Sequence, residues 1–474
     1  MIKRRDAVTA ALFGSGLLGL RALATGLPAW FLANPRQATA QDLTCAITAK
    51  DKLQYLVVAA SSNGDPINCN CPGTYEAASA VHPDQATVAR TDVKLGSKTY
   101  GAALPWASTE FSGALAAATL SRINFFHYRT GSVVHGDQQK VMKMMGGTNR
   151  GEMLISIYAK YLASCLGTVQ ADPISVGAGR NATELLSFQG RPAANVSPTS
   201  LKAMLGGSTS GTGGGRSGAS ALKSLRSLRD QTLDQLNELA KQDSTNVQKQ
   251  FLDALASSQR QVRQLAEALA STLSSITADD VKGQALAAAA LISANVTPVV
   301  SMHIPFGGDN HSDQNLQAEA DQLVTGVQGI QALLDALTKL GLQDKVTFAT
   351  LNVFGRNLDG ISKVMSKSGR DHYANHAVAV LIGKNIAPGV TGGVMPGGGG
   401  STFGSPSSAL GAADIDSATG AGQAGGDVPS AQTYGALART LGAALGIPAS
   451  AMATELTASA GGKVINSALN GVTG

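Results

Sequence analysis

Acidic and histidine side chains, the residue types that bind divalent metals, recur in four short polar stretches of this 474-residue sequence. Two of the seven histidines stand in DHYANH at 371–376. In GGDNHSD at 307–313, an acid and a histidine two positions apart would point the same way in an extended backbone and reach one ion. SNGDPIN at 62–68 and VVHGDQ at 133–138 complete the set. The candidate metal ligands are Asp65, Asp309, His311, Asp371, His372 and His376.

Zinc or manganese would suit such a mixture of carboxylates and imidazoles. Either ion would stabilise an oxyanion and lower the pKa of a water or a hydroxyl nucleophile. A purely structural role stays open for single residues: Asp65 could terminate a turn, and His376 could equally belong to a surface cap. His303, inside an apolar stretch, is expected to pack in the core.

The elements that would position these residues are buried strands separated by helices. Apolar, β-branched stretches predict strands at 52–60, 298–304, 345–354 and 377–383. A long helix is predicted over 312–344, with Ser312 or Asp313 as its cap. Near-continuous apolar strands alternating with helices indicate the α/β class, with a mainly parallel sheet flanked by helices. Loops beyond the carboxyl ends of its strands would form the ligand crevice.

Three segments interrupt this pattern within an otherwise single domain, 41–474. Residues 206–220 are a Gly/Ser linker, and 391–426 form a Gly-rich loop. Leucines at helical spacing predict a helical insertion over 221–275, either two packed helices or a coiled coil that binds a partner.

Residues 1–40 have the features of an export signal of the twin-arginine type. A basic head is followed by a mild apolar stretch and an A-x-A sequence at 38–40. The alternative is an uncleaved anchor, but its glycines and proline make a poor permanent span. Cleavage would leave 32 basic and 31 acidic residues, which argues against a nucleic-acid partner. We therefore expect a periplasmic or secreted protein with no permanent membrane span.

Four cysteines in an exported chain permit disulfides. The two in CNC at 69–71 are too close for an easy mutual bridge, so pairing of Cys69 or Cys71 with Cys45 or Cys165 is the expectation. A structural zinc site is the minor alternative, because the chain has no CxxC pair.

Residues from about 285 to 395 resemble the family of exported bacterial proteins called "domain of unknown function 1501", within the alkaline phosphatase and sulfatase superfamily. The family's Gly-Phe-Asp-Thr-His type motif is similar to FGGDNHSDQ, through Asp309 and His311. Its other motifs are matched by Phe354, Gly355 and Arg356 in NVFGRN, by Gly369, Asp371 and His372, and by Gly64, Asp65 and Asn68 in the first turn. The resemblance implies an alkaline phosphatase-like fold, and Arg356 or Arg370 would contact an anionic substrate.

Two positions depart from the family pattern. Val353 stands where the second motif usually carries a glutamate. Val134 replaces the serine of a Ser-His-Phe turn, whereas His135 keeps its histidine. If that serine were the nucleophile, Ser132 would be a poor substitute, so Ser132 and His135 are weak catalytic candidates.

Three functions follow as hypotheses. The first is an exported metal-dependent hydrolase of phosphate or sulfate esters, with a small anionic substrate. The second is a catalytically decayed family member that acts as a periplasmic binding or envelope-assembly protein, with or without one metal. The third is an interaction protein that uses the helices of 221–275.

Overall fold

The computed structural model describes residues 45–473 apart from 46, 48, 79–81, 109–113, 178–186, 189–190, 206–230, 233, 243, 247, 250–251, 254, 258–265, 359–368 and 397–409. The predicted export signal and the Gly/Ser linker lie outside these residues. The described residues of the predicted insertion are largely helical, and α11 (Ala266–Ser274) lies within it. No helix among the described residues is long and apolar enough to cross a membrane.

The centre of the molecule is a mixed sheet of eight strands in the order β14-β4-β13-β10-β1-β9-β5-β8. Parallel pairing joins β1 to both β9 and β10, and it also joins β5 to β8 and β9. β13 pairs antiparallel with β10 and β4. The strands span Tyr55–Ser61 (β1), Ile123–Tyr128 (β4), Ile174–Ser175 (β5), Ala194–Asn195 (β8), Val299–Met302 (β9), Val346–Asn352 (β10), Ala377–Ile382 (β13) and Gly389–Thr391 (β14).

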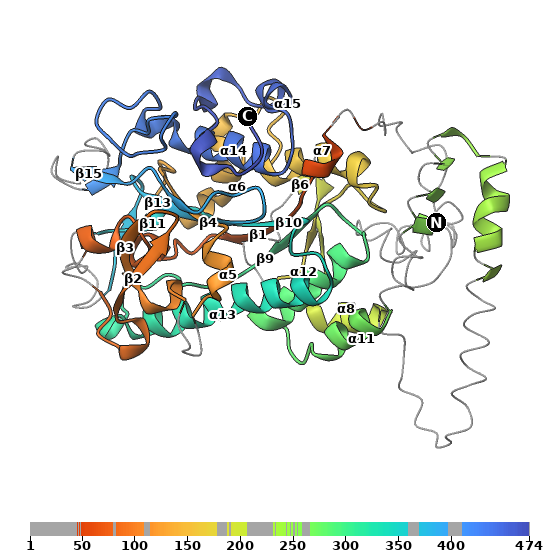
Figure 1. The fold of residues 1–474 in the computed structure, drawn as a ribbon, viewed down its shortest axis with the longest axis horizontal. Helices are drawn as coiled ribbons and strands as arrows, with labels where there is room; N and C mark the ends of the chain where they lie inside the picture. The colour runs from red at the N-terminus through yellow and green to blue at the C-terminus, as the bar shows by residue number, and fades with distance from the viewer. Residues whose placement is uncertain are drawn as a thin grey trace, which may run out of the picture.

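Helices cover both faces of this sheet (Figure 1). Side chains alternate along β1, so Val57 and Ala59 join one core and Leu56 and Val58 join the other. The first core includes residues of α12 (Val281–Ser293) and α13 (Gln317–Lys339), and the second includes residues of α7 (Leu154–Leu166) and α14 (Thr433–Ala444). The predicted α/β class is confirmed, and every residue of β1 is buried because both faces are covered.

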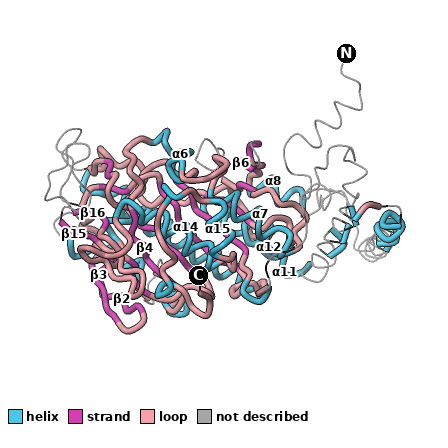
Figure 2. Tube along the Cα trace, turned by 90° about the horizontal axis from the view of Figure 1, so that it is seen from above, coloured by secondary structure: helices cyan, strands magenta, loops and turns pink. Residues whose placement is uncertain are grey.

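Different elements lie toward the two ends of the molecule (Figure 2). Figure 2 shows α8 (Pro198–Leu205), α11 and α12 gathered at one end, with β15 (Val394–Pro396) and β16 (Leu410–Ala412) toward the other. β15 and β16 form a short antiparallel pair, so part of the predicted 391–426 loop is regular structure. Two helices, α14 and α15 (Ala449–Glu455), follow this pair toward the C-terminus.

The antiparallel direction of β13 decides which loops meet. Ser61 and Asn352 are paired at the carboxyl ends of β1 and β10. Ala377, at the amino end of β13, pairs with Tyr128, at the carboxyl end of β4. The segment that precedes β13 therefore lies at the same edge of the sheet as the loops that follow β1, β4, β9 and β10.

The disulfide pattern corrects the expectation from the sequence. Cys45 is bonded to Cys165, and this bridge attaches the start of the described chain to α7. Cys69 and Cys71 are buried free thiols. Both lie in or directly after the short helix α4 (Ile67–Asn70), which packs inside the fold, and burial raises the pKa of each thiol to about 12.

Candidate metal centre

Three candidate metal ligands converge at this edge of the sheet. His135 comes from the loop after β4, Asp309 from the loop after β9, and His372 from β12 (His372–Tyr373), just before β13. The distance from His135 Nε2 to Asp309 Oδ2 is 3.3 Å, and that from His372 Nε2 to Asp309 Oδ1 is 3.4 Å. The ligand atoms of His135, Asp309 and His372 all lie within 4.8 Å of one another, which is close enough for the three residues to hold one metal ion.

Backbone carbonyls orient both histidine rings. His135 Nδ1 lies 2.6 Å from the Ser62 oxygen, and His372 Nδ1 lies 2.6 Å from the Val133 oxygen. A carbonyl oxygen only accepts, so each Nδ1 carries the proton and donates it. In the neutral form, each ring would present its Nε2 lone pair toward Asp309. Histidines that bind metals are commonly held in this way, because the hydrogen bond of the nitrogen that does not bind the metal fixes the tautomer and the orientation of the ring.

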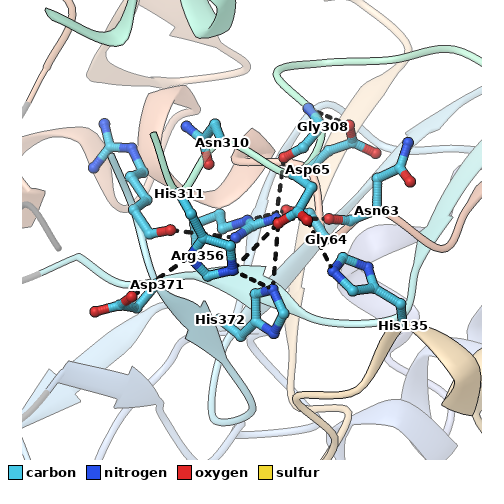
Figure 3. A network of polar contacts seen from close by, with 12 residues as sticks. Asn63, Gly64, Asp65, His135, Gly308, Asn310, His311, Arg356, Asp371 and His372 are labelled. Atoms are coloured by element: carbon cyan, nitrogen blue, oxygen red, sulfur yellow. Dashed lines mark hydrogen bonds and ion pairs between the residues drawn. The ribbon is translucent and has the colours of Figure 1, made fainter. Parts of the chain in front are cut away.

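His311 and Asp371 extend the cluster, and Figure 3 shows the rings of His135, His311 and His372 turned toward one another. His311 Nε2 lies 2.7 Å from His372 Nε2 and 3.3 Å from Asp309 Oδ1. The other ring nitrogen of His311 lies 3.5 Å from Asp371 Oδ1. A proton held at Nδ1, toward Asp371, would free Nε2 of His311 as a fourth ligand.

Asp65 is buried beneath the candidate metal centre and is bonded to the backbone of a neighbouring loop. Its side chain is 1% exposed, and Oδ1 accepts hydrogen bonds from the backbone N–H groups of Phe306 (3.0 Å) and Gly308 (2.9 Å). These bonds shape the loop that carries Asp309. The predicted ligand Asp65 is therefore placed as a positioning residue.

Arg356, which the resemblance assigned to an anionic substrate, is fully buried. Its guanidinium donates to Asp309 Oδ1 at 2.8 Å. The three guanidinium nitrogens also donate to the backbone oxygens of Asn63, Gly64, Gly308 and Arg370. Desolvation acts to raise the pKa of Asp309, but the hydrogen bond and charge of Arg356, together with smaller contributions from His135 and His372, hold that pKa below its ordinary value. Arg356 therefore holds together the loop after β1, the loop after β9 and the segment before β12 through its hydrogen bonds.

Arg370 is also buried, in an ion pair with Glu319 from the first turn of α13. Arg370 Nε lies 2.7 Å from one carboxylate oxygen of Glu319, and Nη2 lies 2.9 Å from the other. Asn70 and Asn310 donate to the same carboxylate, each at 2.7 Å. This network anchors the segment before His372 to the helix, and neither partner is presented to solvent.

His376 lies apart from the candidate metal ligands, in a separate network of buried hydrogen bonds. His127 Nε2 donates to the Pro72 oxygen at 3.2 Å, which leaves Nδ1 of the neutral ring as an acceptor. His376 Nε2 donates to that Nδ1 at 2.9 Å, and its own Nδ1 accepts from Asn68 at 3.3 Å. Burial lowers the pKa of both rings, that of His127 to about 4. His376 is therefore a neutral, fully bonded core residue.

The residues discussed as nucleophiles are not poised for attack. Ser132 is 3% exposed, donates to Asp137 at 2.9 Å and accepts from the Val134 N–H at 3.2 Å. Val353 is buried in the core, whereas Val134 is 52% exposed beside His135. No hydroxyl therefore stands where the family's Ser-His-Phe turn would place one.

Two glycines of the matched motifs permit close backbone approach. Gly64 has a φ of +67°, and a Cβ there would lie 1.8 Å from the Phe354 ring. A Cβ on Gly369 would lie 2.0 Å from the His311 oxygen. Phe354 in turn packs on the His372 ring, with centroids 4.2 Å apart. Larger residues at either glycine would push apart the loops that hold the ligands.

Sequence reasoning undervalued His135, which it treated as a weak catalytic candidate rather than as a ligand. The signal was present, because VVHGD matches the histidine of the Ser-His-Phe turn. It did not single out Glu319, and it gave no role to Asn310 within GGDNHSD, since no motif marks such internal hydrogen-bond partners.

A cavity of about 560 Å³ lies between β2 (Arg90–Leu95), β3 (Lys98–Ala103) and the β14–β15 region. None of the metal-cluster residues lines it. Among its charged residues, Arg90 is paired with Glu76 and Asp92. The clustered histidines and acids therefore remain the better candidate for chemistry.

The fold and this cluster define an α/β protein with a candidate site for a divalent metal. Residues 190–409 match the family described as "Protein of unknown function (DUF1501)". The match supports the resemblance that the motifs indicated, and it includes Asp309, Arg356 and His372 but not His135. No curated protein matches the chain.

Proposed function

We propose that this protein is a metal-dependent hydrolase of phosphate or sulfate esters. The observation that carries the proposal is the pair of Nε2 lone pairs, on His135 and His372, that face the Asp309 carboxylate at 3.3 and 3.4 Å. Lone pairs and a carboxylate repel one another unless a proton or a metal ion lies between them. Two imidazoles and one carboxylate suit zinc or manganese.

A divalent ion at this site would lower the pKa of a water and stabilise a developing oxyanion. The chain's own residues would orient the reaction. Asp309 is kept ionised by Arg356, and its side chain is 46% exposed, so the site is open to a substrate. Because Ser132 is engaged and Val134 has no hydroxyl, water is the proposed nucleophile.

The proposal also includes an alkaline phosphatase-like fold and export by the twin-arginine route to the periplasm or beyond. The motif order and the mostly parallel sheet support the first point. The basic head and A-x-A sequence of residues 1–40 support the second.

A catalytically decayed protein for periplasmic binding or envelope assembly is the second candidate. The observation that favours it is the burial of Arg356 and Arg370, since both are bonded internally and neither is exposed to hold an anionic substrate. Val353 and Val134 point the same way. Such a protein would bind the metal without hydrolysis.

The test combines metal analysis with an assay. We expect the purified chain to hold stoichiometric zinc or manganese and to hydrolyse an aryl phosphate or aryl sulfate. His135→Ala and His372→Ala should each weaken metal binding by at least about a hundredfold, since each removes a ligand. His82→Ala is the matched control, because His82 stacks on Tyr75, with ring centroids 3.7 Å apart, and belongs to no ligand group. A metal-free wild type would refute the proposal, whereas metal without turnover would favour the decayed protein.

A further inference from the structure

The cluster of candidate metal ligands also contains a positively charged side chain, the guanidinium of Arg356. Arg356 Nη2 lies 2.8 Å from Asp309 Oδ1, the same oxygen that His372 Nε2 approaches at 3.4 Å. The guanidinium is fully buried, and its nitrogens donate to backbone oxygens of three different loops. It therefore has no alternative position to which it could move when an ion arrives.

The Asp65 carboxylate, next to Asp309, is also engaged in hydrogen bonds. Asp65 Oδ1 accepts two backbone N–H groups, from Phe306 and Gly308, and Oδ2 lies 3.5 Å from Asn352 Nδ2. The charge of Asp65 also acts on Arg356. One guanidinium thus balances much of the negative charge of Asp65 and Asp309. The remaining carboxylate of the cluster, Asp371, lies on the far side of His311, 3.5 Å from its Nδ1.

Short-range repulsion would act against a second divalent ion. An ion bound to Asp309 Oδ1 on the side of Arg356 would lie close to a fixed positive charge in a partly desolvated site. On the opposite side, the oxygens of Asp309 face His135 and His372, and that side is compatible with an ion. One side of the Asp309 carboxylate, facing His135 and His372, is therefore open to an ion. The other side is occupied by the Arg356 guanidinium.

We propose that Arg356 takes the place of a second metal ion, so that this site binds a single divalent ion per chain. Arg356 is then a positioning residue, which orients Asp309 and limits both the number of ions and their affinity. This inference rests on the proposed function, because it presupposes that His135, Asp309 and His372 bind metal.

Metal titration of the wild-type chain tests the stoichiometry directly. Calorimetry with Zn²⁺ and with Mn²⁺, checked by elemental analysis after dialysis, should saturate at one equivalent. Two equivalents with the triad occupied would overturn the inference and leave the hydrolase proposal standing. No binding at all would overturn both.

Variants test whether the charge of Arg356 is the cause. Arg356→Gln keeps a hydrogen-bond donor but removes the charge, and it should bind the first ion about tenfold more tightly and admit a second. Arg356→Lys keeps the charge and should stay at one equivalent. Arg122→Gln, which removes an arginine paired with Asp344 at the amino end of β4, is the control and should behave as wild type. A folded Arg356→Gln chain with wild-type affinity and stoichiometry would refute the role of the charge. If neither Arg356 variant folds, the wild-type stoichiometry still decides whether the site binds one ion or two, and two would overturn the inference.

Discussion

Arg356 and His372 lie directly opposite each other in the two-residue antiparallel ladder of β11 (Gly355–Arg356) and β12. The ladder brings a buried guanidinium and a candidate metal ligand to the same atom, Asp309 Oδ1, at 2.8 and 3.4 Å. A buried positive charge and a candidate metal ligand thus meet at one carboxylate oxygen. The neighbouring guanidinium lowers the pKa of Asp309, and the proposal that the site binds one ion rather than two rests on this relationship.

The buried pair of Glu319 and Arg370 should dominate the stability of this edge. Glu319→Gln leaves the Arg370 charge buried without its carboxylate, and we expect a loss of about 3–5 kcal/mol in the free energy of unfolding. Urea denaturation monitored by circular dichroism measures it. Glu76→Gln, in an exposed pair with Arg90, is the control and should change that free energy by no more than about 1 kcal/mol. Equal effects would show that the burial of the pair is unimportant.

Gly64→Ala should destabilise the protein through two separate causes. The new Cβ would meet the Phe354 ring at 1.8 Å, and a side chain at φ +67° is strained. Gly151→Ala isolates the second cause, because Gly151 has a φ of +64° and nothing within 4 Å of the added Cβ. We expect losses of about 3 kcal/mol at Gly64 and about 1 kcal/mol at Gly151 by urea unfolding. A smaller loss at Gly64 would mean that Phe354 moves freely.

The buried pair of His127 and His376 should make stability depend on pH. Burial lowers the folded-state pKa of both rings, to about 4 for His127, whereas an unfolded histidine titrates near about 6.5. Between these values the unfolded chain binds more protons, so stability falls as the pH falls from about 6.5 to about 4. The loss due to His127 is at most about 3 kcal/mol.

His127→Gln removes this titration, so the comparison isolates it from the other groups. Unfolding measured at several pH values should show a shallower decline for the variant than for the wild type. Parallel curves would mean that the two rings do not stay neutral in the fold.

Thiol reactivity should reveal the cysteine pairing. The native chain should have no rapidly reacting thiol, because Cys69 and Cys71 are buried and Cys45 is bonded to Cys165. Denaturant without reductant should expose two thiols, and reduction should then expose all four. Peptide mapping should recover the bridge between the first and last of them. A mixed bridge that includes Cys69 would contradict the structure.

The sequence by itself determined the local elements and the positions of most candidate ligands. Apolar runs predicted β1, β9, β10 and β13 because a strand buried on both faces must be apolar throughout. Ser312 or Asp313 was predicted as the cap of a helix over 312–344, but α13 begins only at Gln317, directly after Leu316. The Asp313 carboxylate still accepts from the N–H groups of Ala318 and Glu319 in the first turn. Such signals are local, since they depend on residues a few positions apart.

Only the tertiary structure decided how these pieces combine. Asp371 and His372 precede their strand, and in an all-parallel sheet they would lie at the opposite edge from Asp309. The antiparallel direction of β13 brings them to the same edge, and strand direction depends on neighbours distant in sequence. The inward direction of Arg356 and the burial of His376 also depend on residues that are distant in sequence. Both are set by partners from other loops, which no local pattern encodes.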